Sequence, residues 1–202
     1  RYSSSLKKIS KVVDSRPGEI MFGLNMVVNK GKTVFIADTT VHEYPSSKQL
    51  AEIAKSSARV VRLFGFDPKI AFLSHSTFGT PLTSRTKHIR DAVEILKEMK
   101  VDFKFDGDMQ PDVALDETYK ELYPLSEIVG KANVLIMPGQ HSAAISYKIM
   151  KTLGGAKVIG PLLIGLGRAI EIAPLRSSTS DILNLASVAA YSSGVINYGK
   201  IN

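Results

Sequence analysis

The chain has 202 residues, of which 44% are hydrophobic and 22% are charged, and its formal net charge is +7. This composition is typical of a folded globular protein and excludes a disordered chain. Because it contains no cysteine, it has neither a disulfide framework nor a thiolate metal site, and its four histidines lack a zinc-ligand spacing. With no apolar membrane span and no secretory signal in the sequence, we expect a cytoplasmic chain.

Helical and strand-like patterns alternate along the chain. The predicted helices cover residues 3–15, 46–65, 83–100, 111–122 and 140–155, and a last one begins near 178. The predicted strands cover residues 19–28, 32–38, 69–76, 101–109, 132–139 and 156–166. The first two strands are separated by "NKGK", which predicts a hairpin. The alternation predicts an α/β fold with a mostly parallel sheet and helices on both faces.

The positive charge permits an anionic partner without demanding one. Basic and acidic residues are interleaved along helical patterns, as in 83–100, which favours a solvated helix face over a nucleic-acid surface. With few aromatic residues and no nucleic-acid motif, we set nucleic acid aside. A small polyanion such as phosphate or coenzyme A remains compatible with this charge.

Ligands of such sheets bind beyond the carboxyl ends of the strands, which directs attention to four loops. In the loop 74–80, the residues Ser74, Ser76, Thr77 and Gly79 are interpreted as turn-forming, with phosphate binding as the alternative. The other three loops cover residues 106–112, 137–142 and 159–168.

The second and third loops also have a structural interpretation. Asp106, Asp108 and Asp112 lack the remaining ligands of a calcium loop, so turn formation and capping are favoured over a metal site. In "MPGQHS", Gly139 is expected to let the backbone turn, and His141 is interpreted as a loop or capping residue rather than an acid/base catalyst.

At these loops the chain resembles the phosphate acetyl/butyryl transferase family. The similar stretches are "LSHSTFG", "DGDMQPDVAL", "KANVLIMPGQHSAAISYKIMKTLGGAKVIGPLLIGLGRAIEI" and "SDIL", and the resemblance runs from about residue 1 to 198. It is closer still to the version of this family at the C-terminus of large bacterial malic enzymes. The resemblance implies ligand-binding residues in the loops, namely Ser74, Ser76, Thr77, Gly79, Asp106, Gly139, Gln140, Ser142 and Gly160.

The resemblance also implies a catalytic site, and this chain departs from it. Asp181 falls on the aspartate that takes the proton of the coenzyme A thiol, while Pro174 and Leu175 stand where the family has a Ser-Arg pair. Neither side chain carries charge or donates a hydrogen bond, so the groups that stabilise the transition state are expected to be lost. Arg176 stands one position further on. The alternative interpretation of Asp181 is helix capping, and this is favoured.

The resemblance further implies a phosphotransacetylase or isocitrate-dehydrogenase-like fold with two domains, of which this chain is a fragment. Residues 20–161 would form the inserted domain, and residues 1–19 and 162–202 a remnant of the first. A malic enzyme would bind NADP, a divalent metal and malate upstream of this chain.

Three functional hypotheses follow. The leading one is a regulatory and oligomerising module of an NADP-dependent malic enzyme that binds acetyl-CoA and is degenerate as a transferase. The first alternative is an active phosphate acetyltransferase with Asp181 as base and Arg176 in place of the missing pair. The second is a structural dimerisation domain without ligand. The resemblance implies a homodimer or higher homo-oligomer in each case.

Overall fold

The computed structural model describes residues 2–128 and 130–198. Its helices are α1 (Tyr2–Ile9), α2 (Ser47–Leu63), α3 (Ser84–Glu98), α4 (Pro111–Leu115), α5 (Gln140–Thr152) and α6 (Thr179–Tyr198), with a 3-10 helix, η1, at Glu117–Glu121. Its strands are β1 (Phe22–Asn29), β2 (Lys32–Ala37), β3 (Lys69–Leu73), β4 (Lys104–Met109), β5 (Val134–Ile136) and β6 (Lys157–Ile164).

The six strands form one sheet in the order β4-β3-β5-β2-β1-β6. The strands β4, β3, β5 and β2 are parallel neighbours, whereas β1 is antiparallel to both β2 and β6. It follows that β6 points the same way as β2 and that β1 alone runs in the opposite direction. The predicted mostly parallel α/β sheet and the β1–β2 hairpin are both confirmed.

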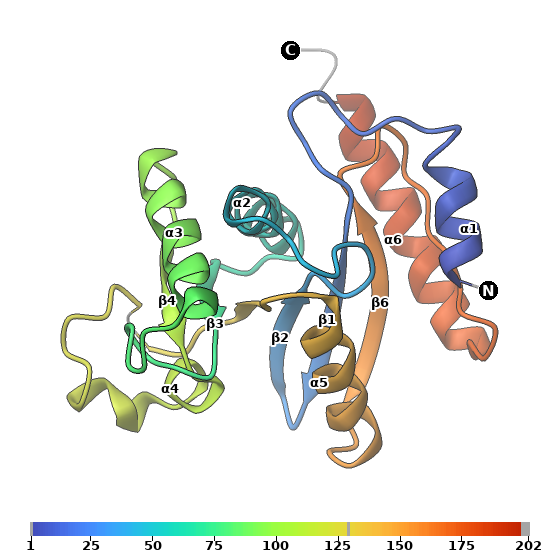
Figure 1. Cartoon of the computed structure of the whole chain (residues 1–202). Coiled ribbons are helices and arrows are strands. Elements are labelled where there is room, and N and C mark those ends of the chain that lie inside the picture. The colour runs from blue at the N-terminus through green and yellow to red at the C-terminus, as the bar shows by residue number, and fades with distance from the viewer. Residues whose placement is uncertain (1, 129, 199–202) are drawn as a thin grey trace.

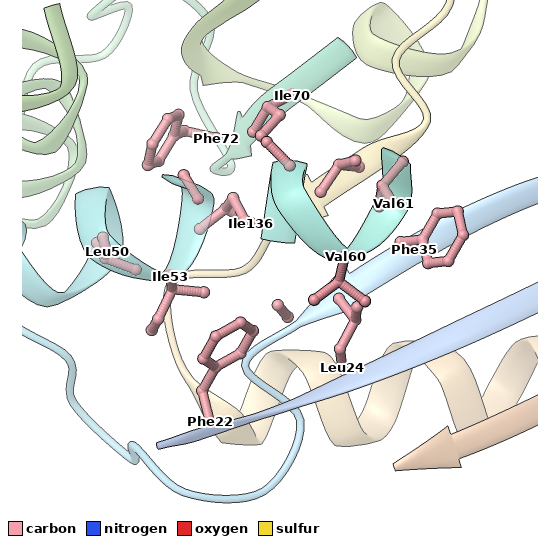
Figure 2. Packing of buried hydrophobic residues seen from close by; sticks show 14 of the residues in the cluster. Phe22, Leu24, Phe35, Leu50, Ile53, Val60, Val61, Ile70, Phe72 and Ile136 are labelled. Atoms are coloured by element: carbon pink, nitrogen blue, oxygen red, sulfur yellow. The ribbon is translucent and has the colours of Figure 1, made fainter. Parts of the chain in front are cut away.

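Helices cover both faces of the sheet, as predicted. One face packs against α2, α3 and Leu185 of α6, and the other packs against α4 and α5. Figure 1 shows α3 and β4 at one end of the sheet and α1 and α6 at the other, beyond β6. Figure 2 shows the centre of the first layer, where Ile53 and Val60 of α2 face Phe22 and Leu24 of β1. Burial of these large side chains stabilises the sheet by about 1.5 to 3 kcal/mol each.

Local sequence explains where α2 begins and ends. Ser46 accepts a hydrogen bond from the Gln49 amide, the Gln49 side chain bonds back to Ser46, and Gly65 follows the helix with a φ of 83°. This capping box and the left-handed glycine are the expected start and stop signals.

The first helix is shorter than predicted. Residues 3–15 were expected to be helical, but α1 ends at Ile9 and gives way to turns. The Ser10 hydroxyl donates to the Lys7 carbonyl, and the β-branched Val12 and Val13 that follow have low helix propensity. Apolar spacing alone therefore overestimated this helix.

The division into residues 20–161 and a remnant stays a prediction. Its second boundary falls inside β6, which continues from 157 to 164 without interruption. Over the described residues, the structure contains no helix that is both long and apolar enough to cross a membrane.

Candidate functional site

The predicted site residues fall into two groups at opposite edges of the sheet. The loops after β3, β4 and β5 lie at the carboxyl edge, because these strands are parallel. The start of β6 lies at the amino edge, because Lys157 pairs with Val28 near the end of the oppositely directed β1. Gly160, Arg176 and Asp181 line one hollow beside the start of β6. Within the described chain, the fold does not bring this second group to the loops at the carboxyl edge.

Polar groups in the loop 74–80 bond mainly to the chain itself. The Ser76 hydroxyl donates to the buried Asp108 carboxylate, and the Gly79 amide donates to the same carboxylate at 3.0 Å. The Ser74 and Ser76 hydroxyls are 3.0 Å apart, and Thr77 Oγ1 accepts from the Gln110 amide. Gly79 has a φ of 80°, as expected for a turn-forming glycine. These bonds support the turn-forming interpretation of the loop.

The other aspartates of 106–112 also serve the backbone. Asp106 accepts hydrogen bonds from the amides of Gly107 and Glu127, at 2.9 and 2.8 Å. Asp112 lies in the first turn of α4 and accepts from the Val113 amide. Among the residues that the structure describes, no group of three or more potential ligands is arranged to hold a metal ion.

Asp38, at the end of β2, is the most densely bonded side chain of the carboxyl edge. Its carboxylate is 1% exposed and accepts from the amides of Gly23, Thr40, Val41 and His42. It also lies 2.6 Å from Nδ1 of the His42 ring. This single carboxylate therefore fixes the start of the segment between β2 and α2.

The segment fixed by Asp38 is joined to the start of α5. The Gln140 amide donates to the His42 carbonyl at 2.9 Å, and the Ser142 hydroxyl donates to the Gly139 carbonyl at 2.8 Å. Gly139 has an extended φ of 168°, so the predicted backbone turn is not the reason for a glycine here. The reason is space: a Cβ at this position would overlap the Glu43 carbonyl oxygen. His141 is an exposed residue at this helix start, 3.8 Å from Glu43.

Asp181 is a capping residue in this structure. Its carboxylate accepts from the Ser178 amide at 2.9 Å, and the Ser178 hydroxyl accepts from the Asp181 amide at 3.2 Å. This reciprocal pair is a capping box that satisfies free donors at the start of α6. Hydrogen bonds from Ser178, and then the charges of Lys151 and Lys157, hold the pKa of Asp181 below its ordinary value. A carboxylate with a lowered pKa is a weaker base toward a thiol.

Replacing Asp181 by alanine is expected to destabilise the chain by about 1 kcal/mol, the usual effect of losing a helix cap. Urea unfolding of the variant measures this. Asp102, an exposed carboxylate paired with Arg62 on the surface, offers the matched control, and its replacement by alanine should leave stability almost unchanged. An equal effect at both positions would contradict the capping role.

The hollow beside Asp181 is small, and three cationic residues against one acidic residue line it. It has a volume of about 210 Å³ and lies between α5 and the start of α6. Lys148, Lys151 and Arg176 line it together with Asp181, Gly160 and Pro161. In the part of the chain that the structure describes, Arg176 forms no ion pair with Asp181. The arrangement suits a phosphate group better than it suits activation of Asp181.

A larger hollow of about 810 Å³ lies between residues 12–19, α2, α6 and the segment after β6. Glu171 lines it, and the Leu163 amide donates to its carboxyl at 2.9 Å. Burial raises the pKa of Glu171 to about 8, against the opposing effect of the Leu163 hydrogen bond. Burial also raises the pKa of the nearby Tyr2 hydroxyl, and Glu171 is the second cause.

Glu171 should make stability fall as the pH rises. Its carboxyl is protonated in the folded chain at neutral pH but ionised in the unfolded chain, so its stabilising effect is complete below about pH 4.5 and is lost toward pH 8. We expect Glu171→Gln to reduce the loss of unfolding free energy between pH 5 and pH 8 by roughly 2 to 3 kcal/mol. Urea unfolding at both pH values measures it; an unchanged pH dependence in the variant would refute the assignment.

Three residues in these arrangements were not predicted from the sequence. Asp38 and His42 stand in "ADTTVHE", where the only available signal was an acidic residue directly after an apolar strand. Glu171 stands in the apolar stretch "AIEIAP", where an isolated acid among apolar residues signals burial. Most partners of Asp38 lie within four residues of it, but its bond to Gly23 and the bond of Glu171 to Leu163 depend on the fold.

The family comparison covers nearly the whole chain. A model of the family described as "Phosphate acetyl/butaryl transferase" matches residues 1–190. An NADP-dependent malic enzyme of Rhizobium meliloti is 44% identical over 193 residues, covering 96% of this chain and 25% of that protein. A phosphate acetyltransferase of Bacillus subtilis is 35% identical over 166 residues, covering 81% of this chain and 51% of that protein.

Solved structures that are similar to this chain are also phosphotransacetylases. A phosphotransacetylase from Streptococcus pyogenes matches with a TM-score of 0.89 and 31% identity, over 96% of this chain and 60% of that one. The EutD phosphotransacetylase from Staphylococcus aureus matches with a TM-score of 0.86 and 28% identity. This chain therefore spans about a quarter of the malic enzyme, half of the acetyltransferase and three fifths of the phosphotransacetylase.

Proposed function

Because the chain belongs to the phosphate acetyl/butyryl transferase family, we propose that it is the acetyl-CoA-binding regulatory and oligomerising part of an NADP-dependent malic enzyme. Oxidative decarboxylation of malate, with NADP and a divalent metal, belongs in this proposal to the rest of that enzyme. The chain's own contribution is to bind a coenzyme A thioester without transferring its acyl group.

The observation that carries the proposal is that the catalytic groups expected of a transferase are replaced or bonded to the chain itself. Pro174 and Leu175 occupy the positions where the family resemblance expects a serine and an arginine, and Leu175 is 92% exposed. The Asp181 carboxylate accepts a hydrogen bond from the Ser178 amide. Turnover requires a base and fixed cations aimed at the transition state, whereas binding requires only shape and a few polar contacts.

The hollow beside Asp181 supports ligand binding. Lys148 and Lys151 come from the last half of α5, and Arg176 comes from the segment before α6. Three cations around 210 Å³ match the size and charge of a phosphate or pyrophosphate group, which is one part of coenzyme A. The rest of the ligand would lie outside this hollow, since drug-sized pockets measure about 300 to 1,000 Å³.

Regulation requires more than binding. The ligand must bind two arrangements of the oligomer with different affinities, because equal affinity shifts no equilibrium. In the proposal, the chain forms a homodimer or higher homo-oligomer, and the ligand at α5 and α6 biases its arrangement.

Calorimetric titration of the full-length protein with acetyl-CoA tests the proposal. Replacing Lys148 and Lys151 together by glutamate is expected to weaken binding at least about 100-fold, since two attractive charges become repulsive. Lys55→Glu on the exposed side of α2 is the matched control and should bind as the parent protein does. Failure of acetyl-CoA to bind the parent protein would reject the proposal in favour of a structural dimerisation domain without ligand.

An active phosphate acetyltransferase is the alternative. It is favoured by one observation, that Arg176 and Asp181 line the same hollow. In that case Asp181 would take the thiol proton and Arg176 would stabilise the developing charge.

A further inference from the structure

The larger hollow, of about 810 Å³, has the volume of a small-molecule site. Ligand pockets measure about 300 to 1,000 Å³. Its walls come from the segment after α1, from α2, from the end of β6 and from α6, and Figure 1 shows that segment between α2 and α6. The larger hollow lies at the end of β6, whereas the hollow beside Asp181 lies near the start of that strand. The two hollows are therefore separate.

Much of the wall of the larger hollow is apolar. Leu63 of α2, Leu163 of β6 and Val188 of α6 contribute to it. Val12 and Tyr191 also line the hollow and are 84% and 56% exposed, respectively. Apolar side chains that gather in a hollow indicate a binding site, whereas single ones scattered over a surface do not. A ligand with an apolar body would be stabilised here by the release of water.

Three arginines line the larger hollow, and only one of them is paired with an acid. Arg59 donates to both carboxylate oxygens of Glu19, at 2.5 and 2.7 Å. Arg16 donates through Nε to the Leu166 carbonyl at 3.0 Å, which holds its side chain beside the end of β6. In the part of the chain that the structure describes, neither Arg16 nor Arg168 forms an ion pair. Two guanidinium groups are therefore available to an anion.

The acids of the larger hollow do not cancel this charge. Glu19 is paired with Arg59. Burial raises the pKa of Glu171 to about 8, so this carboxyl adds no negative charge at pH 7. The exposed Asp14 is the remaining acid of the lining. Arg16 and Arg168 against Asp14 leave an excess of one positive charge, which matches a ligand with a single negative charge.

The backbone segments that carry Arg16 and Arg168 are bonded to each other. The Arg16 amide donates to the Gly165 carbonyl at 2.8 Å. The Gly167 amide donates to the Asp14 carbonyl at 2.9 Å. These bonds position the backbone beside both arginines, so less conformational entropy is lost when a ligand binds there.

We propose that the larger hollow binds a small organic monocarboxylate, whose carboxylate lies at Arg16 and Arg168 and whose aliphatic body lies along the apolar wall. Guanidinium groups suit a carboxylate because their N–H donors match its two oxygens. A phosphate monoester carries nearly two negative charges at neutral pH and fits an excess of one positive charge less well. The inference goes beyond the proposed function, since it assigns a second ligand site away from the hollow beside Asp181.

Calorimetric titration of the full-length protein at pH 7 with butyrate, hexanoate and octanoate tests the proposal. Affinity is expected to rise about fourfold for each added methylene group, because each one buries apolar surface against the wall. Octan-1-ol has the same aliphatic body without the charge and should bind at least about 10-fold more weakly than octanoate. No binding of octanoate, or binding of octan-1-ol that is equally tight, would overturn the proposal.

Two exposed positions test the site without weakening the fold. Arg168→Ala removes one guanidinium and should weaken octanoate binding at least about 10-fold. Val12→Asp places a carboxylate in the apolar wall and should weaken it by a similar factor. Arg85→Ala is the matched control, since Arg85 is an exposed arginine of α3 that does not line the hollow. Octanoate binding by Arg168→Ala that equals binding by Arg85→Ala would refute the assignment.

The carboxylate site and the acetyl-CoA site can fail separately. Replacing Lys148 and Lys151 by glutamate should leave octanoate binding unchanged, because neither lysine lines the larger hollow. Arg168→Ala should likewise bind acetyl-CoA as the parent protein does, because Arg168 does not line the hollow beside Asp181. Octanoate binding that is lost in the double lysine variant would place octanoate beside Asp181 and overturn the second site.

Discussion

Replacing Asp38 by alanine is expected to lower the free energy of unfolding by about 4 kcal/mol, a large fraction of the stability of an ordinary domain. The carboxylate accepts from four backbone amides, and its removal leaves buried donors without partners. Each unsatisfied buried donor costs about 1 to 3 kcal/mol, and relaxation of the loop after β2 recovers part of that sum. Urea unfolding followed by circular dichroism measures the change.

The control for Asp38 is an aspartate whose contacts are exposed. Asp91 pairs with Lys87 on the surface of α3. Surface pairs of this kind contribute about 0 to 1 kcal/mol, so Asp91→Ala should unfold almost as the parent does. If Asp38→Ala were as mild as Asp91→Ala, the segment after β2 would not depend on that carboxylate.

Replacing Gly165 by alanine is the second large expected effect, a loss of about 3 to 4 kcal/mol. Gly165 follows β6 with a φ of 88°, and an added Cβ would overlap the backbone carbonyl of Ile20. The atoms that the added Cβ would meet belong to the backbone of Ile20 and Met21, so no flexible side chain can move aside. The Gly165 carbonyl also accepts a hydrogen bond from the Arg16 amide. The substitution combines a forbidden conformation with a steric overlap, and urea unfolding reports the sum.

Gly155 separates these two causes. Its φ is 64°, so alanine is strained there too, but an added Cβ would meet no atom within 4 Å. Gly155→Ala should therefore cost only about 1 kcal/mol, the conformational part alone. Equal losses at the two glycines would show that the contact with Ile20 is unimportant.

The fold was predictable from the periodicity of apolar residues because the local sequence of most elements favours the structure that they adopt. The run "KIAFL" and the capping signals of Ser46 and Gly65 specify their elements without help from distant residues. The first helix was predicted too long because Val12 and Val13 have helical spacing but a low helix propensity, which an apolar pattern ignores.

The candidate site was less accessible to sequence reasoning. The sequence does not show that Asp181 lies apart from the loops after β3, β4 and β5. That separation depends on β6, which pairs with β1 and therefore starts at the amino edge. Gly139 was expected to provide a turn, but its role depends on the close approach of Glu43, nearly 100 residues earlier in the chain. The raised pKa of Glu171 depends on burial, which no local pattern states.

The two edges suggest different roles. At the carboxyl edge, Asp38, Asp106 and Asp108 accept hydrogen bonds from the chain's own backbone, and the segment bonded by Asp38 contacts the start of α5 through the His42 carbonyl. At the amino edge, Lys148 and Lys151 of the same helix face a hollow. In the proposed function, these two lysines of α5 therefore carry the ligand contacts.

The central claim is that a coenzyme A site persists in this chain without the groups that stabilise acyl transfer. A coupled assay for acetyl-CoA formation from acetyl phosphate and coenzyme A, on the full-length protein and on Asp181→Asn, tests this claim most directly. We expect no turnover above background from either protein, although acetyl-CoA binds. Turnover by the parent protein that Asp181→Asn abolishes would contradict it.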